Sequence, residues 1–280
     1  MRAVSWSDGN NLFATASDPF KSDEFGLISI YDFPSNELLS TAQANSAATR
    51  SDDATPSHVP ILEIAVEHND KATALAWSYG NEFLVVGFDS GMIIKYDPIS
   101  GKEIARRTDA HKQRINRITF NTDKTLFISA SKDCSAKLFD PYTLDIIKVY
   151  RTDRPVNGAV ISPTHPHVLL GGGQEAMNVT VTAASKGKFE SKFFHMIYEE
   201  EFGRVKGHFG PINAIAVHPQ GKSFASGSED GYVLFFSFCV CVYLSLLVFT
   251  PFTPLFDDIL MYYYIIIASS CVPSILLPIL

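Results

Sequence analysis

Apolar and polar residues follow the same pattern five times along the first 230 positions. Each copy begins with a short strand of alternating residues, passes through a polar turn into a second strand rich in small residues, and ends in a polar residue. The copies occupy residues 3–18, 74–89, 115–133, 156–174 and 212–230. Alternation over four to eight residues indicates β-strands, and strands that are apolar on both faces are typical of sheets buried between neighbours. The pattern therefore predicts an all-β chain made of repeats.

The spacing of the copies indicates which repeat this is. The first strand of each copy ends at an anchor residue, and successive anchors are 71, 43, 41 and 56 residues apart; they are Trp6, Trp77, Phe120, Ile161 and Val217. Two intervals match the roughly 40–45 residues of a four-stranded propeller blade. The longer intervals predict insertions at residues 35–58, a low-complexity segment rich in Ala, Ser and Thr, and at residues 183–206, which carry charged and aromatic sequence.

A short dipeptide closes a later strand in several copies. It occurs as Tyr31-Asp32, Tyr96-Asp97 and Phe139-Asp140. An aromatic residue followed by Asp once in each blade is the WD signature, here with Phe or Tyr in place of Trp. Repeat length and dipeptide together predict a WD-repeat β-propeller of about five blade equivalents over residues 1–233.

Two copies also resemble WD-repeat proteins in a second feature, a hydrogen-bonded network built from a His, a strand Ser or Thr, a turn Asp and the closing Trp. Carried over to this chain, the network residues are His111, Ser129, Asp133 and Phe139 in the third copy, and His208, Ser226, Asp230 and Phe236 in the fifth. The His and Asp are 22 residues apart in both copies. Because Phe has no N–H donor, the network is expected to be shorter than one that ends on Trp.

The chain shows no arrangement of residues typical of catalysis. The glycine run Gly171-Gly172-Gly173 is not followed by the Lys-Ser/Thr of a phosphate loop, so we interpret it as a strand edge. None of the eight His pairs with Cys or a carboxylate at metal-ligand spacing, and no nucleophile elbow or kinase motif is present. We therefore expect a protein without enzymatic activity, cofactor or metal.

Charge narrows the classes of partner. The formal net charge is −7, from 23 Lys and Arg against 30 Asp and Glu, which argues against a broad basic surface for nucleic acid. A local basic cluster, defined here as Arg106, Arg107, Lys112, Arg114 and Arg117, is either a contact for RNA or an acidic partner, or a solvated rim. The acidic run at residues 199–201 leaves the same two alternatives open, a partner contact or a solvated loop.

Several longer phrases resemble one family closely. They are DRPVN from Asp153, LLGGGQEAM from Leu169 and YEEEFGRVKGHFGPINAIAVHPQGKSFASGSEDGYV from Tyr198. These phrases are similar to subunit I of eukaryotic translation initiation factor three, over about residues 1–233 and most weakly over 19–70. The resemblance implies a seven-bladed propeller without enzymatic activity. It also implies a scaffold in the complex that readies the small ribosomal subunit for initiator tRNA and mRNA.

The resemblance carries further expectations about partners and about the start of the chain. The expected partners are the b and g subunits of the factor and the small ribosomal subunit, with mRNA reached only indirectly, in the cytoplasm. The family has two more blades before the point that resembles Met1. The chain is therefore expected to hold part of the propeller.

The last residues differ in kind from the rest. Beyond Asp230 the only charged residues are Asp257 and Asp258, and residues 234–280 form a hydrophobic tail. One alternative is a membrane segment, since a helix over 232–250 would be about 28 Å long and a bilayer core is about 30 Å thick. This alternative would make the chain a membrane-anchored WD-repeat adaptor. The other alternative is intron read-through, because the tail is dominated by residues that thymine-rich codons encode.

Overall fold

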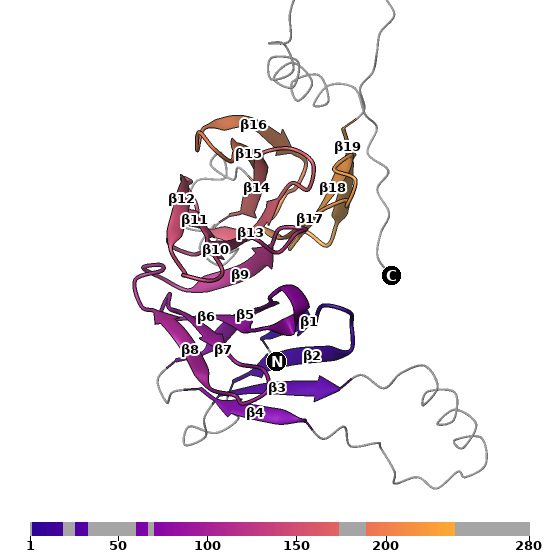
Figure 1. Ribbon diagram of the computed structural model, residues 1–280. Coiled ribbons are helices and arrows are strands. Elements are labelled where there is room, and N and C mark those ends of the chain that lie inside the picture. The colour runs from indigo at the N-terminus through magenta and orange to yellow at the C-terminus, as the bar shows by residue number, and fades with distance from the viewer. Residues whose placement is uncertain (1, 19–25, 33–59, 67–69, 174–188, 239–280) are drawn as a thin grey trace, which may run out of the picture. The chain divides into compact units, whose positions relative to one another are not determined.

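The computed structural model describes residues 2–18, 26–32, 60–66, 70–173 and 189–238 (Figure 1). Within these ranges the regular structure consists of β-strands and one 3-10 turn, which confirms the all-β class. The chain divides into two compact units. One comprises Met1–Thr125 with Asp140–Asp145, and the other Leu126–Phe139 with Ile146–Leu280.

The first unit contains two complete sheets and the first strand of the third repeat. The sheet β1-β2-β3-β4 is formed by Ala3–Trp6, Leu12–Ser17, Leu27–Asp32 and Leu62–Ala65. The sheet β5-β6-β7-β8 is formed by Ala72–Trp77, Leu84–Phe88, Ile93–Tyr96 and Glu103–Arg107, with the 3-10 turn η1 at Tyr79–Asn81. Strand β9, Ile115–Phe120, completes the unit. Neighbouring strands are antiparallel in both sheets.

The second unit contains the rest of the third repeat and the two that follow. Strands β10, β11 and β12 are Phe127–Ser131, Ser135–Phe139 and Ile146–Arg151. The sheet β13-β14-β15-β16 is formed by Val156–Ile161, His167–Gly172, Glu190–His195 and Glu201–Lys206. The sheet β17-β18-β19 is formed by Ile212–Val217, Ser223–Ser228 and Val233–Ser237.

The pairing of the first two strands confirms the predicted repeat. Four anchors lie opposite the first or second residue of the next strand, in the pairs Trp6–Phe13, Trp77–Leu84, Ile161–Val168 and Val217–Phe224. The aromatic-Asp dipeptides fall where the third strands end, with Tyr96 and Phe139 both buried. Antiparallel sheets that follow the chain order of their strands match the blades of a WD-repeat protein.

The described part of segment 183–206 is not the insertion that its charge and length suggested. Its described part supplies β15 and β16, the third and fourth strands of the fourth sheet. The difference has a physical cause: charged residues of these two strands form ion pairs with each other across the sheet, so a high charge content does not mark the segment as a loop. The predicted insertion at 35–58 lies outside the described residues.

The fifth sheet continues past the predicted domain boundary at 233. Residues Val233–Ser237 form β19, where the alternative helix over 232–250 would have begun. Leu234 is buried, and the Phe236 ring stacks on Phe224 with centroids 4.8 Å apart, so these apolar residues complete a β-sheet core. No helix among the described residues has both the length and the apolar character to cross a membrane. Residues 239–280, with the remaining expectations for the tail, lie outside the described part.

At two junctions between successive sheets, isoleucines of the following first strand fill the space beside a glycine. A Cβ added at Gly87 on β6 would lie 2.8 Å from Ile115 and 3.0 Å from Ile118, both on β9. A Cβ at Gly171 on β14 would lie 2.4 Å from Ile215 on β17. The glycines therefore provide holes for the β-branched side chains of the following first strand. We call this arrangement the glycine lock.

A polar side chain reinforces each glycine lock. The second residue of the first strand reaches the carbonyl oxygen that opens the next first strand. Thr73 Oγ1 lies 2.5 Å from the Ile115 oxygen, and Asn157 Nδ2 lies 3.2 Å from the Ile212 oxygen. These hydrogen bonds give a partner to backbone carbonyl groups at the junction between sheets.

Candidate functional site

The fifth repeat brings together His208, Ser226 and Asp230. His208 Nδ1 lies 3.0 Å from Asp230 Oδ2, and His208 Nε2 lies 2.8 Å from Ser226 Oγ. The side chains of His208 and Asp230 are only 2% and 8% exposed. An ionised carboxylate can only accept, so Nδ1–H donates to Asp230, and Nε2 accepts from the Ser226 hydroxyl. The imidazole thereby joins the loop before β17 to β18 and to the turn after it.

Asp230 holds the neighbouring loop in place. Burial by itself would raise the pKa of this carboxyl, but hydrogen bonds from the backbone N–H groups of Tyr232 and Phe209 and from His208 outweigh it. The net result is a lowered pKa. The Phe209 N–H donates to Asp230 Oδ2 at 2.9 Å, while the Phe209 side chain is 87% exposed. The network therefore fixes the backbone of Phe209, whose aromatic ring faces solvent.

Replacing His208 with alanine should lower the free energy of unfolding by about 1–3 kcal/mol, because the Ser226 hydroxyl and the Asp230 carboxylate lose a buried partner. Urea unfolding followed by fluorescence measures the change. The control is His218→Ala, since His218 is exposed and its ring Nδ1 accepts a hydrogen bond from the Gln220 backbone N–H. Equal effects at His208 and His218 would show that the His208 network does not contribute to the free energy of unfolding.

The third-repeat residues are distributed over both units. The His111 side chain is buried in the first unit, and the backbone N–H of His111 donates to the backbone oxygen of Gly91. Ser129 is buried in the second unit, where Asp133 Oδ1 accepts from the N–H and the hydroxyl of Ser135. Phe139 stacks on Phe127 with ring centroids 5.0 Å apart. The network that would join His111 to Ser129 and Asp133 stays a prediction.

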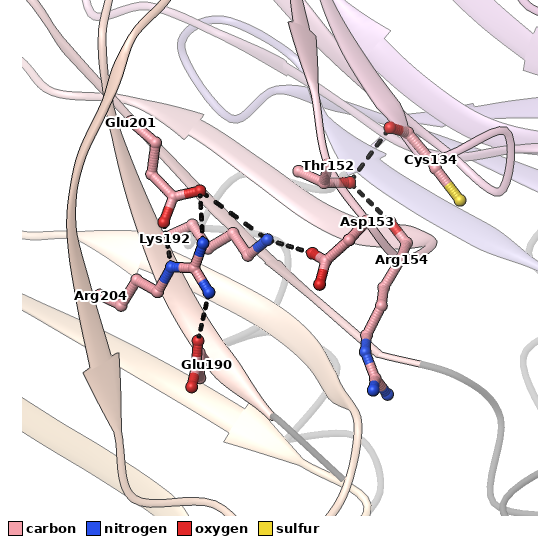
Figure 2. Close-up of polar contacts among 8 residues, drawn as sticks. All are labelled: Cys134, Thr152, Asp153, Arg154, Glu190, Lys192, Glu201 and Arg204. Carbon is pink, nitrogen blue, oxygen red and sulfur yellow. Dashed lines mark hydrogen bonds and ion pairs between the residues drawn. The ribbon is translucent and has the colours of Figure 1, made fainter. Parts of the chain in front are cut away.

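A charged cluster that the sequence did not predict lies on β15 and β16 (Figure 2). Lys192 pairs with Asp153 and lies 3.8 Å from Glu201. Arg204, opposite Lys192 in the sheet, pairs with Glu201 and lies 3.3 Å from Glu190. Each cation therefore contacts two carboxylates, and the buried Glu190 is paired. We call these five residues the β15–β16 charge cluster.

Hydrogen bonds from Thr152 hold the turn that carries Asp153. The Thr152 hydroxyl lies 2.6 Å from the Arg154 oxygen and 3.1 Å from the Cys134 oxygen, and the Thr152 N–H donates to the same Cys134 oxygen (Figure 2). Burial, aided by the negative charges of Asp133 and Asp153, raises the pKa of the Cys134 thiol. The thiol therefore stays protonated near neutral pH and is a poor nucleophile.

Lys192→Met should destabilise the protein in a pH-dependent way. The hydrogen bond from Lys192 lowers the pKa of Asp153 below that of the unfolded chain, about 3.9. A depressed carboxyl pKa stabilises the fold above the unfolded value, and this contribution is lost as pH falls through the folded value. The stability gap between the wild type and Lys192→Met should therefore close below about pH 4. Urea unfolding from pH 7 to pH 3 measures the gap.

The control for this pH dependence is Lys222→Met, which removes an exposed lysine elsewhere. Asp153→Asn should reproduce the closing gap, and combining it with Lys192→Met should add little. A gap that stays constant down to pH 3 would show that Asp153 does not depend on Lys192.

A buried lysine is the main polar feature inside the first unit. Lys95 on β7 is buried, and its Nζ donates to the Pro141 oxygen at 3.1 Å and to the Tyr142 oxygen at 2.5 Å. The same ammonium group lies 4.7 Å from the centre of the Phe83 ring. Burial lowers the pKa of Lys95, and the charge of Asp140 opposes that shift. Lys95 thus attaches the 140–145 segment to the second sheet.

Lys95→Met should cost about 1–3 kcal/mol of unfolding free energy, because a methionine of similar length leaves the Pro141 carbonyl without its donor. Thermal unfolding measures the loss, with Lys71→Met as the control at an exposed site. An unchanged melting temperature would mean that removing the buried charge compensates for the lost hydrogen bonds.

Several of the remaining sequence candidates are engaged in local ion pairs. Arg106 pairs with Glu103 at 2.7 Å, and Arg107 lies 3.1 Å from Asp109. Within the acidic run, Glu199 lies 3.1 Å from Lys148. Such pairing favours the solvated-rim interpretation of the basic cluster. Among the described residues, no group of three or more His, Cys, Asp or Glu is arranged to hold a metal ion.

Comparison with known proteins places these elements in a family. The family model EIF3I matches residues 26–240, a range that includes the His208 network and the β15–β16 charge cluster. The chain belongs to the EIF3I family. The resemblance noted in the sequence is thereby confirmed.

Individual relatives agree with the EIF3I match. The chain is 51% identical over 179 residues to eukaryotic translation initiation factor 3 subunit I of Nematostella vectensis, covering 64% of this chain and 55% of that protein. It is 52% identical over 166 residues to the subunit of the same name from Homo sapiens, covering 59% of this chain and 51% of that protein. The chain spans about half the length of the curated relatives it matches.

Sequence reasoning missed Lys95 and the charge cluster for identifiable reasons. Lys95 lies in an alternating strand, IIKY, where a polar residue normally faces solvent. The charge cluster could have been found by pairing ESKFFH with EFGRVK, since that register places Lys192 opposite Arg204 and Glu190 opposite Lys206. Reading 183–206 as an insertion prevented that step.

Proposed function

We propose that this EIF3I-family chain is a non-enzymatic scaffold component of eukaryotic translation initiation factor 3. The observation that carries the proposal is the family match over residues 26–240, joined to about 50% identity with proteins named as subunit I of that factor. As a scaffold it would support recruitment of mRNA and initiator tRNA to the small ribosomal subunit. Its partners would be other subunits of the factor, the b and g subunits among them, in the cytoplasm.

The chemistry of the described residues supports a binding role. Several of their ionisable side chains are engaged in structural pairs, as in the His208 network and the β15–β16 charge cluster. The Cys134 thiol has a raised pKa, and Lys95 is enclosed by carbonyl groups and a ring. Fixed loops with exposed side chains, such as Phe209 above Asp230, are the features that a protein partner can contact.

Affinity purification of the tagged full chain from a eukaryotic cytosolic extract tests the proposal. We expect the b and g subunits of initiation factor 3, and small ribosomal subunits, to be enriched over a purification with the tag alone. Mass spectrometry of the eluate measures the enrichment. Recovery of the chain without any other subunit of the factor would contradict the proposal.

The hydrophobic sequence of residues 239–280 gives the membrane-anchored adaptor a separate test. Carbonate extraction of membranes from cells that express the full chain leaves a true anchor in the pellet and releases a peripheral protein. A matched chain that ends at Phe238 distinguishes the tail from the sheets. We expect both forms in the carbonate supernatant, and pelleting of the full chain alone would favour the adaptor.

A further inference from the structure

Three turns in the described part of the chain share one hydrogen-bond pattern. Each begins where the third strand of a sheet ends, and each leads into the outer strand of that sheet. The fifth residue of the turn has a left-handed backbone, and its N–H donates to the carbonyl oxygen of the first residue at 2.8–3.0 Å. We call these segments the closing turns, and they are residues 97–101, 140–144 and 195–199.

A carboxylate completes the first two closing turns. Asp97 Oδ1 accepts from the Ile99 N–H at 3.0 Å, and Asp140 Oδ1 accepts from the Tyr142 N–H at 2.8 Å. The Ser100 hydroxyl and the Ile99 N–H hold the pKa of Asp97 below its usual range. A carboxyl group of ordinary pKa, about 3.9, is also ionised from about pH 5 upwards. These two turns therefore keep their acceptor at neutral and mildly acidic pH.

An imidazole completes the third closing turn. His195 follows the buried Phe194, in the position that the Asp of the aromatic-Asp dipeptide occupies in the other two turns. His195 Nδ1 lies 3.3 Å from the Ile197 nitrogen and 3.4 Å from the Tyr198 nitrogen. Because Nδ1 accepts, the proton of the neutral ring is on Nε2. A protonated imidazole donates from both nitrogens, so protonation would leave these two N–H groups facing a third donor.

Two further imidazoles lie near His195. His167 on β14 is buried, and its ring centroid lies 6.0 Å from that of His195. His165 stacks on His167 with centroids 5.5 Å apart, and the Tyr198 ring lies 4.5 Å from the His195 ring. Like charges on neighbouring imidazoles repel each other. Protonation of these rings therefore adds repulsion to the loss of the two hydrogen bonds.

The carboxylates around the third closing turn are directed elsewhere. Glu199 pairs with Lys148 on β12 at 3.1 Å, and Glu201 on β16 belongs to the β15–β16 charge cluster. Glu200 is exposed, and its backbone oxygen accepts from the His195 N–H. Within the described ranges, no carboxylate forms an ion pair with His195. A positive charge on this imidazole thus gains no ion pair in exchange for the lost acceptor.

We propose that the third closing turn is a pH-sensitive switch, which neutral His195 holds closed and protonated His195 releases. Histidine side chains change charge between about pH 5 and pH 8, the range in which the two Asp turns stay intact. The turn carries Ile197 and Tyr198, whose side chains are 54% and 70% exposed. The Tyr150 hydroxyl continues to donate to the Met196 oxygen at 2.8 Å, so the release is local. Acidification thereby changes how two apolar side chains are presented at the surface.

Amide hydrogen exchange of the full chain, read by mass spectrometry at about pH 7.5 and about pH 5.5, tests the switch. Exchange rates are divided by those of the unfolded chain at the same pH, because exchange itself depends on pH. We expect the protection of residues 196–199 to fall several-fold at the lower pH. Residues 141–144, in the Asp140 turn, are the matched control and should not change. Residues 167–172 on β14 report whether the second unit stays folded.

His195→Asp supplies the carboxylate of the other closing turns and should keep residues 196–199 protected at both pH values. His165→Gln removes a neighbouring imidazole and should leave the pH response in place. An unchanged wild-type turn at the lower pH would overturn the proposal, as would an equal loss in His195→Asp. A loss that extends to β14 would show unfolding of the unit in place of a local release. If His195→Asp does not fold, the wild-type comparison between the two turns decides.

Discussion

Gly172→Ala is expected to destabilise the protein by about 3 kcal/mol or more, the upper range for overpacking a filled site. A Cβ at this position would lie 2.0 Å from the Pro155 oxygen, a backbone atom that cannot rotate away. That oxygen also accepts a hydrogen bond from the Gly173 N–H at 3.1 Å, so moving it breaks a second contact. Urea unfolding measures the loss, and a loss of this size would give the middle residue of the glycine run Gly171-Gly172-Gly173 a structural reason.

The matched control is Gly227→Ala, the same chemical change in a strand of the next sheet. Its Cβ would have no neighbour closer than 3.9 Å. An alanine there should change stability by less than about 1 kcal/mol, and in the favourable direction, because it restricts the unfolded chain. Similar losses at Gly172 and Gly227 would show that the glycines matter for backbone freedom and not for close packing.

Ile215→Ala is expected to cost about 2–5 kcal/mol, the range for truncating a buried aliphatic side chain. Ile215 is buried in the core between β14 and β17, where it fills the space above Gly171. Val4→Ala provides the control, because Val4 has the same register position but is half exposed. Thermal unfolding of the two variants compares the loss of a buried aliphatic side chain with the loss of a half-exposed one.

The same pair of residues permits a double-mutant cycle. Gly171→Ala alone should be destabilising, because its Cβ would lie 2.4 Å from Ile215 Cδ1. In the Ile215→Ala background that atom is absent, so Gly171→Ala should cost less than it does alone. Additive losses would mean that the clash lies with Ile212 and not with Ile215.

The sequence predicted the strands well because alternation and anchor spacing depend on local chain geometry. The pairs Trp77–Leu84 and Val217–Phe224 fall at the positions that the repeat indicated. The His208 contacts could also be expected, since a His and an Asp 22 residues apart recur in two copies. Both features repeat along the chain, and repetition distinguishes them from chance.

The charged interior could not be predicted in the same way. Whether Lys95 is buried depends on carbonyl groups at Pro141 and Tyr142, which lie far along the chain. The end of the fifth sheet was equally hidden, because VLFFS in β19 continues directly into an apolar tail. Composition alone does not mark where a sheet ends within a uniformly apolar stretch.

The glycine lock also bears on how the chain arose. Strand register places Ala16, Gly87, Ala130, Gly171 and Gly227 at one position of the repeat, so all five copies have Ala or Gly there. A single ancestral unit that carried this small residue and a β-branched residue in its first strand would already fit a duplicate of itself. Tandem duplication of the gene segment could then lengthen the array without inventing a new interface, and later divergence would be freest at residues outside the lock.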